Sequence, residues 1–165
     1  MKKLLFIIFL FLSLCALSFA QNELTELKVG DKATLKLDKI LQAPVENISS
    51  VKELEGKVLL LEFWRTTCGP CLVAFKYLNQ LKSKFGDSDF EIIAITYQSE
   101  TIVQRRLKTF PINAWIGLDE DESLFLEYGI DGVPTTFLVD KSGIIVERTH
   151  PEAVTEEKIK ELLAK

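Results

Sequence analysis

The stretch VLLLEFWRTTCGPC, residues 58 to 71, decides the fold of this chain. Its first seven residues are almost entirely apolar, which is typical of a β-strand covered on both faces. Pro70 suits the first turn of a helix, where its missing N–H costs nothing. Apolar residues then recur at helical spacing from Cys71 to Phe85, and Gly86 ends the pattern. The stretch therefore predicts a buried strand that leads into a helix, with Cys68 between them.

The remaining sequence continues this alternation of strands and helices. The elements expected after Gly86 are a strand at 90–97, a helix at 100–108, a strand at 114–117, a short helix that follows the acidic loop 119–122 and ends near Tyr128, a hairpin at 135–149 and a helix from Thr155 to Lys165. Weaker strand patterns occur ahead of residue 58, at 34–37 and 45–48. This order predicts an α/β three-layer sandwich, with a mixed central sheet that is parallel at its centre and helices on both faces.

The first twenty residues, MKKLLFIIFLFLSLCALSFA, have the organisation of a secretory signal peptide. A short basic start precedes an apolar run at 4–17, and small residues at 18–20 suit cleavage after Ala20. We therefore expect residues 21–165 to form one exported, periplasmic domain with a core at about 28–165. A retained membrane anchor is the alternative, but the apolar run is shorter than the ~20 residues that a spanning helix needs. Lipidation of Cys15 is disfavoured because Leu14, a large residue, precedes it.

Net charge and cysteine content narrow the possible functions. Cleavage would remove two lysines and no acids, which changes the formal net charge from −4 to −6 and argues against nucleic acid or an anionic membrane as partner. Of the three cysteines, Cys15 would leave with the signal, so Cys68 and Cys71 can pair only with each other. A zinc site needs four ligands and His150 is the only histidine, so we expect no metal and no cofactor.

The spacing of Cys68 and Cys71 at a helix start is suited to redox chemistry. The unpaired N–H groups and the positive end of the helix dipole favour a thiolate, so we expect the pKa of Cys68 to fall below the usual ~8.5. Cys68 would attack a substrate disulfide, and Cys71, one turn further along, would resolve the mixed disulfide. A static structural disulfide is the alternative, but a bridge across three residues closes almost no loop.

Two segments together resemble a known superfamily. LLLEFWRTTCGPC at 59–71 and GIDGVPTTFLVDKSG at 129–143 are similar to thioredoxins, and within that superfamily to the exported TlpA/ResA-like thiol-disulfide oxidoreductases. The lead-in segments KVGDKATLKL at 28–37 and SVKELEGKVLLLEFW at 50–64 also match that group. The resemblance implies that Cys68 attacks, that Cys71 resolves, and that Pro134 is a cis proline whose preceding residue, Val133, pairs through its backbone with bound substrate.

The resemblance also implies partners and a biological setting. Disulfide-bearing exported proteins would be the substrates, apocytochrome c among them, and a membrane thiol relay would supply electrons. Cytochrome c maturation and cell redox homeostasis are the corresponding processes, and we expect a monomer. The family usually reads Trp-Ala-x-Trp-Cys, whereas this chain has WRTTC at 64–68. Arg65 therefore replaces a small residue, and Thr67 replaces a tryptophan that flanks the thiol. These two changes affect the substrate surface and the pKa of the thiol, but they leave the disulfide chemistry intact.

Glu62 occupies the place where thioredoxins carry a buried acid behind the resolving cysteine. Burial should raise the pKa of this carboxyl and allow it to take the proton from Cys71. The alternatives are that Glu62 lies at a sheet edge or pairs with Lys57. Among the other polar and aromatic candidates, we expect Trp64 to form a wall of the active site as well as core, and His150 to be a surface residue. Tyr97 and Gln98 end a central strand, and a place along the substrate groove is the less favoured interpretation of these two residues.

These residues favour a protein-disulfide reductase, because a Gly-Pro pair between the cysteines is shared with reducing thioredoxins. An oxidase or isomerase is a close alternative. A thiol peroxidase is less favoured, because peroxiredoxins place the reactive cysteine three residues after Thr or Ser and that position is Arg65. A non-enzymatic binding module on the same scaffold remains a further alternative, although such a module would be expected to lack one cysteine.

Overall fold

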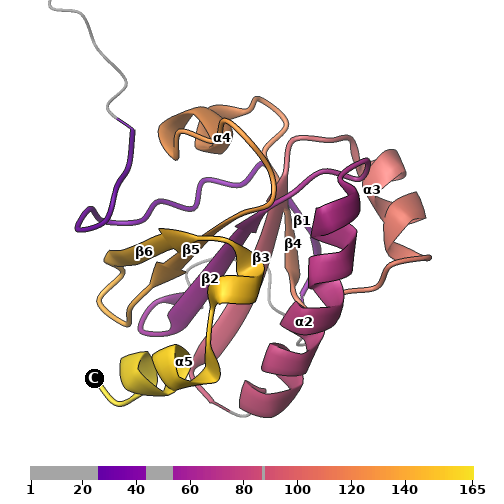
Figure 1. The fold of residues 1–165 in the computed structure, drawn as a ribbon. Helices are drawn as coiled ribbons and strands as arrows, with labels where there is room; N and C mark the ends of the chain where they lie inside the picture. Colours follow the sequence, from indigo (N-terminus) through magenta and orange to yellow (C-terminus); the bar gives the residue numbers. More distant parts are fainter. Residues whose placement is uncertain (1–25, 44–53, 87) are drawn as a thin grey trace, which may run out of the picture.

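The computed structural model describes residues 26–43, 54–86 and 88–165 (Figure 1). The expected signal peptide, Cys15 and the strand pattern at 45–48 lie outside these ranges. The elements are β1 (Lys39–Gln42), β2 (Val58–Phe63), α2 (Gly69–Phe85), β3 (Phe90–Thr96), α3 (Glu100–Leu107), β4 (Trp115–Leu118), α4 (Ser123–Glu127), β5 (Thr135–Val139), β6 (Ile145–Thr149), a 3-10 turn (Pro151–Ala153) and α5 (Glu156–Leu163). From residue 58 onwards, they follow the predicted alternation of strands and helices.

The strands form one six-stranded sheet in the order β1-β4-β3-β2-β5-β6. β2 pairs parallel with β3, and β3 pairs parallel with β4. The three remaining pairs, β1 with β4, β2 with β5 and β5 with β6, are antiparallel. The predicted mixed sheet with a parallel centre is therefore confirmed, and β2, which leads to Cys68, lies in its interior.

Both faces of the central strands are buried, which is why β2 and β3 are nearly continuous apolar runs. Alternate residues of β2 enter two different cores. Val58 and Leu60 lie in the core that contains the buried side chains of α2, α3 and α5. Leu59, Leu61 and Phe63 lie in the core beneath α4. Helices therefore cover both faces, as predicted, but in the described part of the chain the second face has only the short helix α4.

The expected strand at 34–37 is wrong. This segment pairs with no strand, and its apolar residues Leu35 and Leu37 instead pack against the face of the sheet that α4 leaves uncovered. Gly117 of β4 makes room for Leu37, because a Cβ at Gly117 would lie 2.5 Å from a Leu37 methyl carbon. The edge strand β1 begins only at Lys39, two residues after Leu37.

The lead-in segment is also tied to α4 by hydrogen bonds. The Leu27 N–H donates to the Glu127 carbonyl at 2.7 Å, and the Thr34 hydroxyl donates to the Glu127 carboxylate at 2.8 Å. Tyr128, just after α4, donates from its hydroxyl to the Thr34 carbonyl at 2.8 Å. Residues 27–34 therefore hold α4 in place although they are about a hundred positions away in the sequence.

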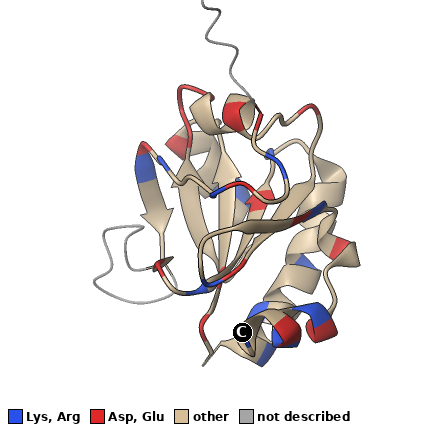
Figure 2. Cartoon of the chain, turned by 90° about the vertical axis from the view of Figure 1, so that its left-hand side faces the viewer, with Lys and Arg blue, Asp and Glu red and all other residues tan. Residues whose placement is uncertain are grey.

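Charged side chains of both signs are interspersed on the surface, as α5 illustrates (Figure 2). Along this helix Lys160 lies 3.8 Å from Glu156, and Lys158 lies 3.9 Å from Glu161. One pair is buried instead: Lys82 of α2 donates to the Glu91 carboxylate of β3 at 2.8 Å. The Lys82 ammonium also donates to a backbone carbonyl, so this ion pair is well hydrogen-bonded and joins α2 to the sheet.

Candidate active site

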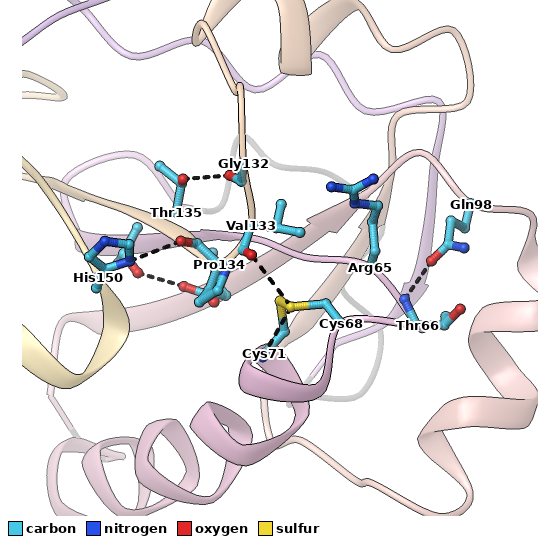
Figure 3. Close-up of a disulfide and its surroundings, with 12 residues drawn as sticks. Arg65, Thr66, Cys68, Cys71, Gln98, Gly132, Val133, Pro134, Thr135 and His150 are labelled. Carbon is cyan, nitrogen blue, oxygen red and sulfur yellow. Dashed lines mark hydrogen bonds between the residues drawn. A yellow bond between two sulfur atoms is a disulfide. The ribbon is translucent and has the colours of Figure 1, made fainter.

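The two cysteines lie at the connection between β2 and α2, at the carboxyl end of a central strand (Figure 3). Cys68 is the N-cap of α2, and its sulfur accepts a hydrogen bond from the Cys71 N–H at 3.2 Å. A disulfide joins Cys68 to Cys71, with 5.3 Å between their Cα atoms. Cys71 is completely buried, whereas Cys68 is partly exposed. Only Cys68 is therefore open to an incoming disulfide.

A loop that leads into β5 faces the disulfide. The Val133–Pro134 peptide bond is cis, and the Val133 carbonyl oxygen lies 3.6 Å from the Cys68 sulfur (Figure 3). The Thr135 hydroxyl donates to the Gly132 carbonyl at 2.7 Å, which fixes the loop on either side of the proline. The structure thus brings Val133 and Pro134 beside Cys68, although more than sixty residues separate them in the sequence.

Glu62 lies on β2 with its carboxyl completely buried. One oxygen, Oε2, accepts a hydrogen bond from the Thr136 hydroxyl at 2.6 Å, and the other, Oε1, has no partner among the described residues. Burial raises the pKa of Glu62 to about 8, the Thr136 hydrogen bond opposes that rise, and the charge of Glu152 adds to it. The expected direction of the pKa shift is confirmed.

The alternative placements of Glu62 are not found. β2 lies between β3 and β5, so Glu62 is not at a sheet edge. The Lys57 ammonium lies 3.9 Å from a carboxylate oxygen of Glu91 instead. By the alternation of the strand, Glu62 lies on the same face as Leu60 and Trp64, and these two share a core with Cys71. The Glu62 carboxyl is therefore on the side of the sheet that carries Cys71.

Trp64 is completely buried and packs edge-on against Phe75 of α2, with 4.9 Å between the ring centroids. Its indole N–H has no hydrogen-bond partner among the described residues. The expectation that Trp64 forms a wall of the site is therefore corrected in one respect. The tryptophan is core behind the cysteines, and it offers no surface to a substrate in this form.

Polar residues after β3 hold the loop between Trp64 and Cys68. The Gln98 side-chain oxygen accepts from the Thr66 N–H at 2.5 Å, and an Arg65 Nη donates to the Tyr97 hydroxyl at 3.3 Å. Gln98 thus has a positioning role toward the loop, while Tyr97 borders a surface hollow described below. His150 is exposed, as expected, and its Nδ1 contacts the Pro134 carbonyl oxygen at 3.1 Å (Figure 3).

A hollow of about 190 Å³ adjoins this loop, and we call it the Arg65 pocket. Its lining comprises Arg65, Tyr97, Glu122, Phe125, Leu126, Ile130, Asp131, Gly132 and Val133. The sequence patterns did not identify the contribution of α4, because Phe125 and Leu126 reach the site only through the fold. A larger hollow of about 500 Å³ lies by the start of β2 and includes Leu59, at the opposite end of that strand from Cys68.

Three acidic side chains beyond β4 also come together. Oxygen atoms of Asp38, Asp119 and Asp121 lie within 4.8 Å of one another. The buried Asp119 carboxylate accepts hydrogen bonds from the N–H groups of Leu124 and Phe125, both at 3.0 Å. Asp38 accepts one from a backbone N–H at 2.6 Å. These acids therefore serve as hydrogen-bond acceptors that secure α4 and the loop before it.

Residues 28–163 match the Redoxin family. The chain belongs to the Redoxin family. This Redoxin domain is 32% identical over 108 residues to the thiol-disulfide oxidoreductase ResA of a Bacillus cereus strain, an alignment that covers 65% of this chain and 62% of that protein. The chain thus spans less than two thirds of the length of that curated relative. The resemblance to ResA-like proteins that the two motifs indicated is confirmed.

Solved structures with the same fold are known. A protein of Chlorobium tepidum, described as a DsbE-type thiol:disulfide interchange protein, is 26% identical, with a TM-score of 0.69 over 84% of this chain and 99% of that one. The thioredoxin domain of a thiol-disulfide oxidoreductase from Bacteroides vulgatus gives a TM-score of 0.67 at 22% identity, over 82% and 95% of the two chains. The Redoxin domain therefore has the predicted α/β thioredoxin-like fold.

Proposed function

We propose that this protein is an exported thiol-disulfide oxidoreductase that acts chiefly as a reductase of protein disulfides. The observation that carries the proposal is the Cys68–Cys71 disulfide at the start of α2, with one cysteine partly exposed and the other buried. This difference in exposure supports different roles for the two sulfurs. The similarity to thiol-disulfide oxidoreductases supports the same class of reaction.

In the first step, the reduced protein attacks its substrate through Cys68. The Cys71 N–H and the amino-terminal end of α2 stabilise negative charge on the Cys68 sulfur. This thiolate attacks one sulfur of the substrate disulfide, so a mixed disulfide forms and the other substrate sulfur leaves as a thiolate that takes a proton from solvent. The backbone of Val133, next to the Cys68 sulfur, is the group that we expect to pair with the substrate strand.

In the second step, Cys71 resolves the mixed disulfide. Its thiol must lose a proton in a buried site, and the ionised carboxylate of Glu62, on the same sheet face, is the group that accepts it. The Cys71 thiolate attacks the Cys68 sulfur, the Cys68–Cys71 disulfide forms, and the second substrate sulfur leaves. Two electrons pass from the dithiol to the substrate, so a dithiol donor must then reduce the protein, and we expect a membrane thiol relay in that role.

Export and partners belong to the same proposal. The signal-peptide pattern of residues 1–20 supports secretion to an oxidising compartment, and apocytochrome c is among the disulfide-bearing exported proteins that we expect as substrates. We also expect a monomer. Within the described ranges, every helix is too short or too polar to cross a membrane.

The reduction potential of the Cys68–Cys71 couple tests the direction of the reaction. A reductase should equilibrate near the value of thioredoxin, about −270 mV, whereas a strong oxidase lies near about −120 mV. The measurement is titration of the couple in glutathione or dithiothreitol buffers, paired with an insulin-reduction assay. An oxidising potential together with disulfide formation in a reduced substrate would favour the oxidase or isomerase alternative.

A further inference from the structure

The Arg65 guanidinium is an unusual group beside the reacting sulfurs. It is partly buried and donates one hydrogen bond, to the Tyr97 hydroxyl. No carboxylate lies within 4.0 Å of it in the ranges that the structure describes. A guanidinium has five N–H donors in a planar fork that matches a carboxylate, so most of its donors remain available. Arg65 therefore has free N–H donors and a positive charge with which it can bind an acidic ligand.

Two acids stand on the rim of the Arg65 pocket, and neither neutralises Arg65. The Asp131 side chain is 93% exposed and lies 3.5 Å from the Arg148 guanidinium. Glu122 is likewise exposed, at the turn that precedes α4. Exposed charges are weakened by solvent and salt more than partly buried ones. Solvent and salt therefore screen the partly buried Arg65 guanidinium less than the two acids at the rim.

Part of the lining of the Arg65 pocket is apolar. Phe125 is nearly buried, and its ring packs edge-on against Tyr97, with 4.9 Å between the ring centroids. Leu126 is 61% exposed and adds apolar surface to the lining. A side chain with methylene groups and a terminal carboxylate fits such a combination, because the stem can cover the apolar wall while the charge meets Arg65.

The pocket is placed to bind a residue close to the reacting cysteine of a substrate. Val133 lines the pocket, and its carbonyl oxygen lies 3.6 Å from the Cys68 sulfur. A substrate strand that pairs with the Val133 backbone would therefore present its cysteine to Cys68 and a neighbouring side chain to the pocket. The α4 wall is already held in position, because Asp119 accepts from the first N–H groups of α4.

We propose that the Arg65 pocket is a specificity subsite for an acidic side chain one or two residues from the reactive cysteine of the substrate. Glutamate fits it best: its carboxylate accepts hydrogen bonds from Arg65 and the Tyr97 hydroxyl, and its methylene groups lie on Phe125. This inference rests on the proposed disulfide chemistry and adds to it a preference for acidic substrate segments.

The test uses short, terminally capped peptides that contain one cysteine as its 2-thiopyridyl disulfide. The residue next to the cysteine, or two positions away, is Glu, Gln, Leu or Lys. Reduced full-length mature protein attacks the peptide sulfur, and the released pyridine-2-thione reports the second-order rate by absorbance. At low salt we expect the Glu peptide to react about three to ten times faster than the Gln peptide, the range for a partly exposed charge-assisted pair.

Variants of arginine provide the matched comparison. In R65Q the Glu-to-Gln rate ratio should fall to about one, and in R65E the Lys peptide should become faster than the Glu peptide. R105Q removes an exposed arginine of α3 and should retain the wild-type ratio. Each ratio is taken within one protein, so a general change in thiol reactivity cancels.

Several outcomes would overturn the subsite. They are a wild-type Glu-to-Gln ratio of one or below, a Leu peptide that reacts fastest, and an unchanged ratio in R65Q. The wild-type ratio decides the matter even if a variant does not fold. Failure of the proposed function is distinct, because then no peptide in the series would form a mixed disulfide with Cys68 and release pyridine-2-thione.

Discussion

The Thr136 hydroxyl donates to the buried carboxyl of Glu62 over 2.6 Å, between residues that are direct cross-strand partners on β5 and β2. The hydrogen bond engages only one carboxyl oxygen and stabilises the ionised form, whereas burial disfavours that form more strongly. The result is an acid whose pKa is raised to about 8. Such a group changes its protonation near neutral pH, which is where a proton acceptor for a thiol is most useful.

Replacement of Glu62 by glutamine should slow resolution of the mixed disulfide. In the wild type, we expect the rate to rise as pH approaches about 8, because the ionised acceptor becomes more abundant. E62Q should lose that component and be about a hundredfold slower at neutral pH. Quenched-flow measurement of mixed-disulfide decay from pH 6 to 10 tests this. E120Q, a change at an exposed acid, is the control, and an unaltered E62Q profile would refute the proton-acceptor role.

Removal of the Thr136 hydroxyl should shift the pH dependence of mixed-disulfide resolution. The hydrogen bond from Thr136 lowers the pKa of Glu62, so its loss in T136V should raise that pKa further. The rise in resolution rate should then occur at higher pH, while the limiting rate stays close to that of wild type. A ¹³C-detected NMR titration of the Glu62 carboxyl in both proteins measures the shift directly. A shift to lower pH would contradict the assignment.

Glu62 should also make the folded protein less stable as pH rises. Its pKa is raised from 4.5 to about 8 in the folded state, so the folded protein holds a proton that the unfolded chain releases between these values. The contribution of Glu62 to the free energy of unfolding is therefore fully present below about pH 4.5 and is lost as the pH rises toward about 8. The free energy of unfolding of E62Q should not show this decline. Between about pH 4.5 and 8 it should therefore rise by roughly 3 to 5 kcal/mol relative to that of the wild type. Urea unfolding of the two oxidised proteins tests it, and parallel pH curves would disprove it.

The unequal exposure of the two cysteines predicts unequal trapping. C71S retains the partly exposed Cys68 and lacks the resolving thiol, so it should accumulate a mixed disulfide with substrate. C68S retains only the buried Cys71 and should accumulate little or none. Non-reducing electrophoresis with mass spectrometry compares the two variants and identifies the captured partner. Equal capture by both would mean that Cys71 is accessible and would reverse the assigned roles.

Asp119 should contribute to stability through the start of α4. In D119A the N–H groups of Leu124 and Phe125 lose their acceptor in a buried setting, which should cost about 1–3 kcal/mol. Chemical denaturation of the oxidised protein measures this loss. D121A removes an exposed carboxylate that accepts from the Ser123 N–H at 3.0 Å and should cost less. Equal losses in the two variants would contradict the importance of burial.

The parts of the structure that the sequence predicted correctly have strong local signals. The strand of residues 58–63 is a continuous apolar run, and α2 combines proline at its start with regular helical spacing. The hairpin of β5 and β6 surrounds a recognisable Lys-Ser-Gly turn. The placement of Val133 beside Cys68 came from the family motif, since no local pattern could bring such distant residues together.

The missed parts depend on contacts between distant segments. Residues 34–37 carry apolar side chains that suit a strand, but those side chains pack onto the sheet face and the edge strand starts later. The helix that supplies Phe125 and Leu126 to the Arg65 pocket is only five residues long, too short for a periodic pattern to indicate which side faces the site. Whether the Trp64 ring would be exposed at the site or buried behind it likewise depended on how the core packs, which the residue type alone does not determine.

The attachment of residues 27–34 to α4 bears on where the functional unit begins. In sequence, this segment resembles a linker ahead of the first long strand. In space, it supports a helix that lines the Arg65 pocket. A protein trimmed to begin at Val58 would keep both cysteines, Glu62 and the cis proline, yet it would lack the support for one wall of the Arg65 pocket. The smallest unit with the complete site therefore starts no later than Leu27.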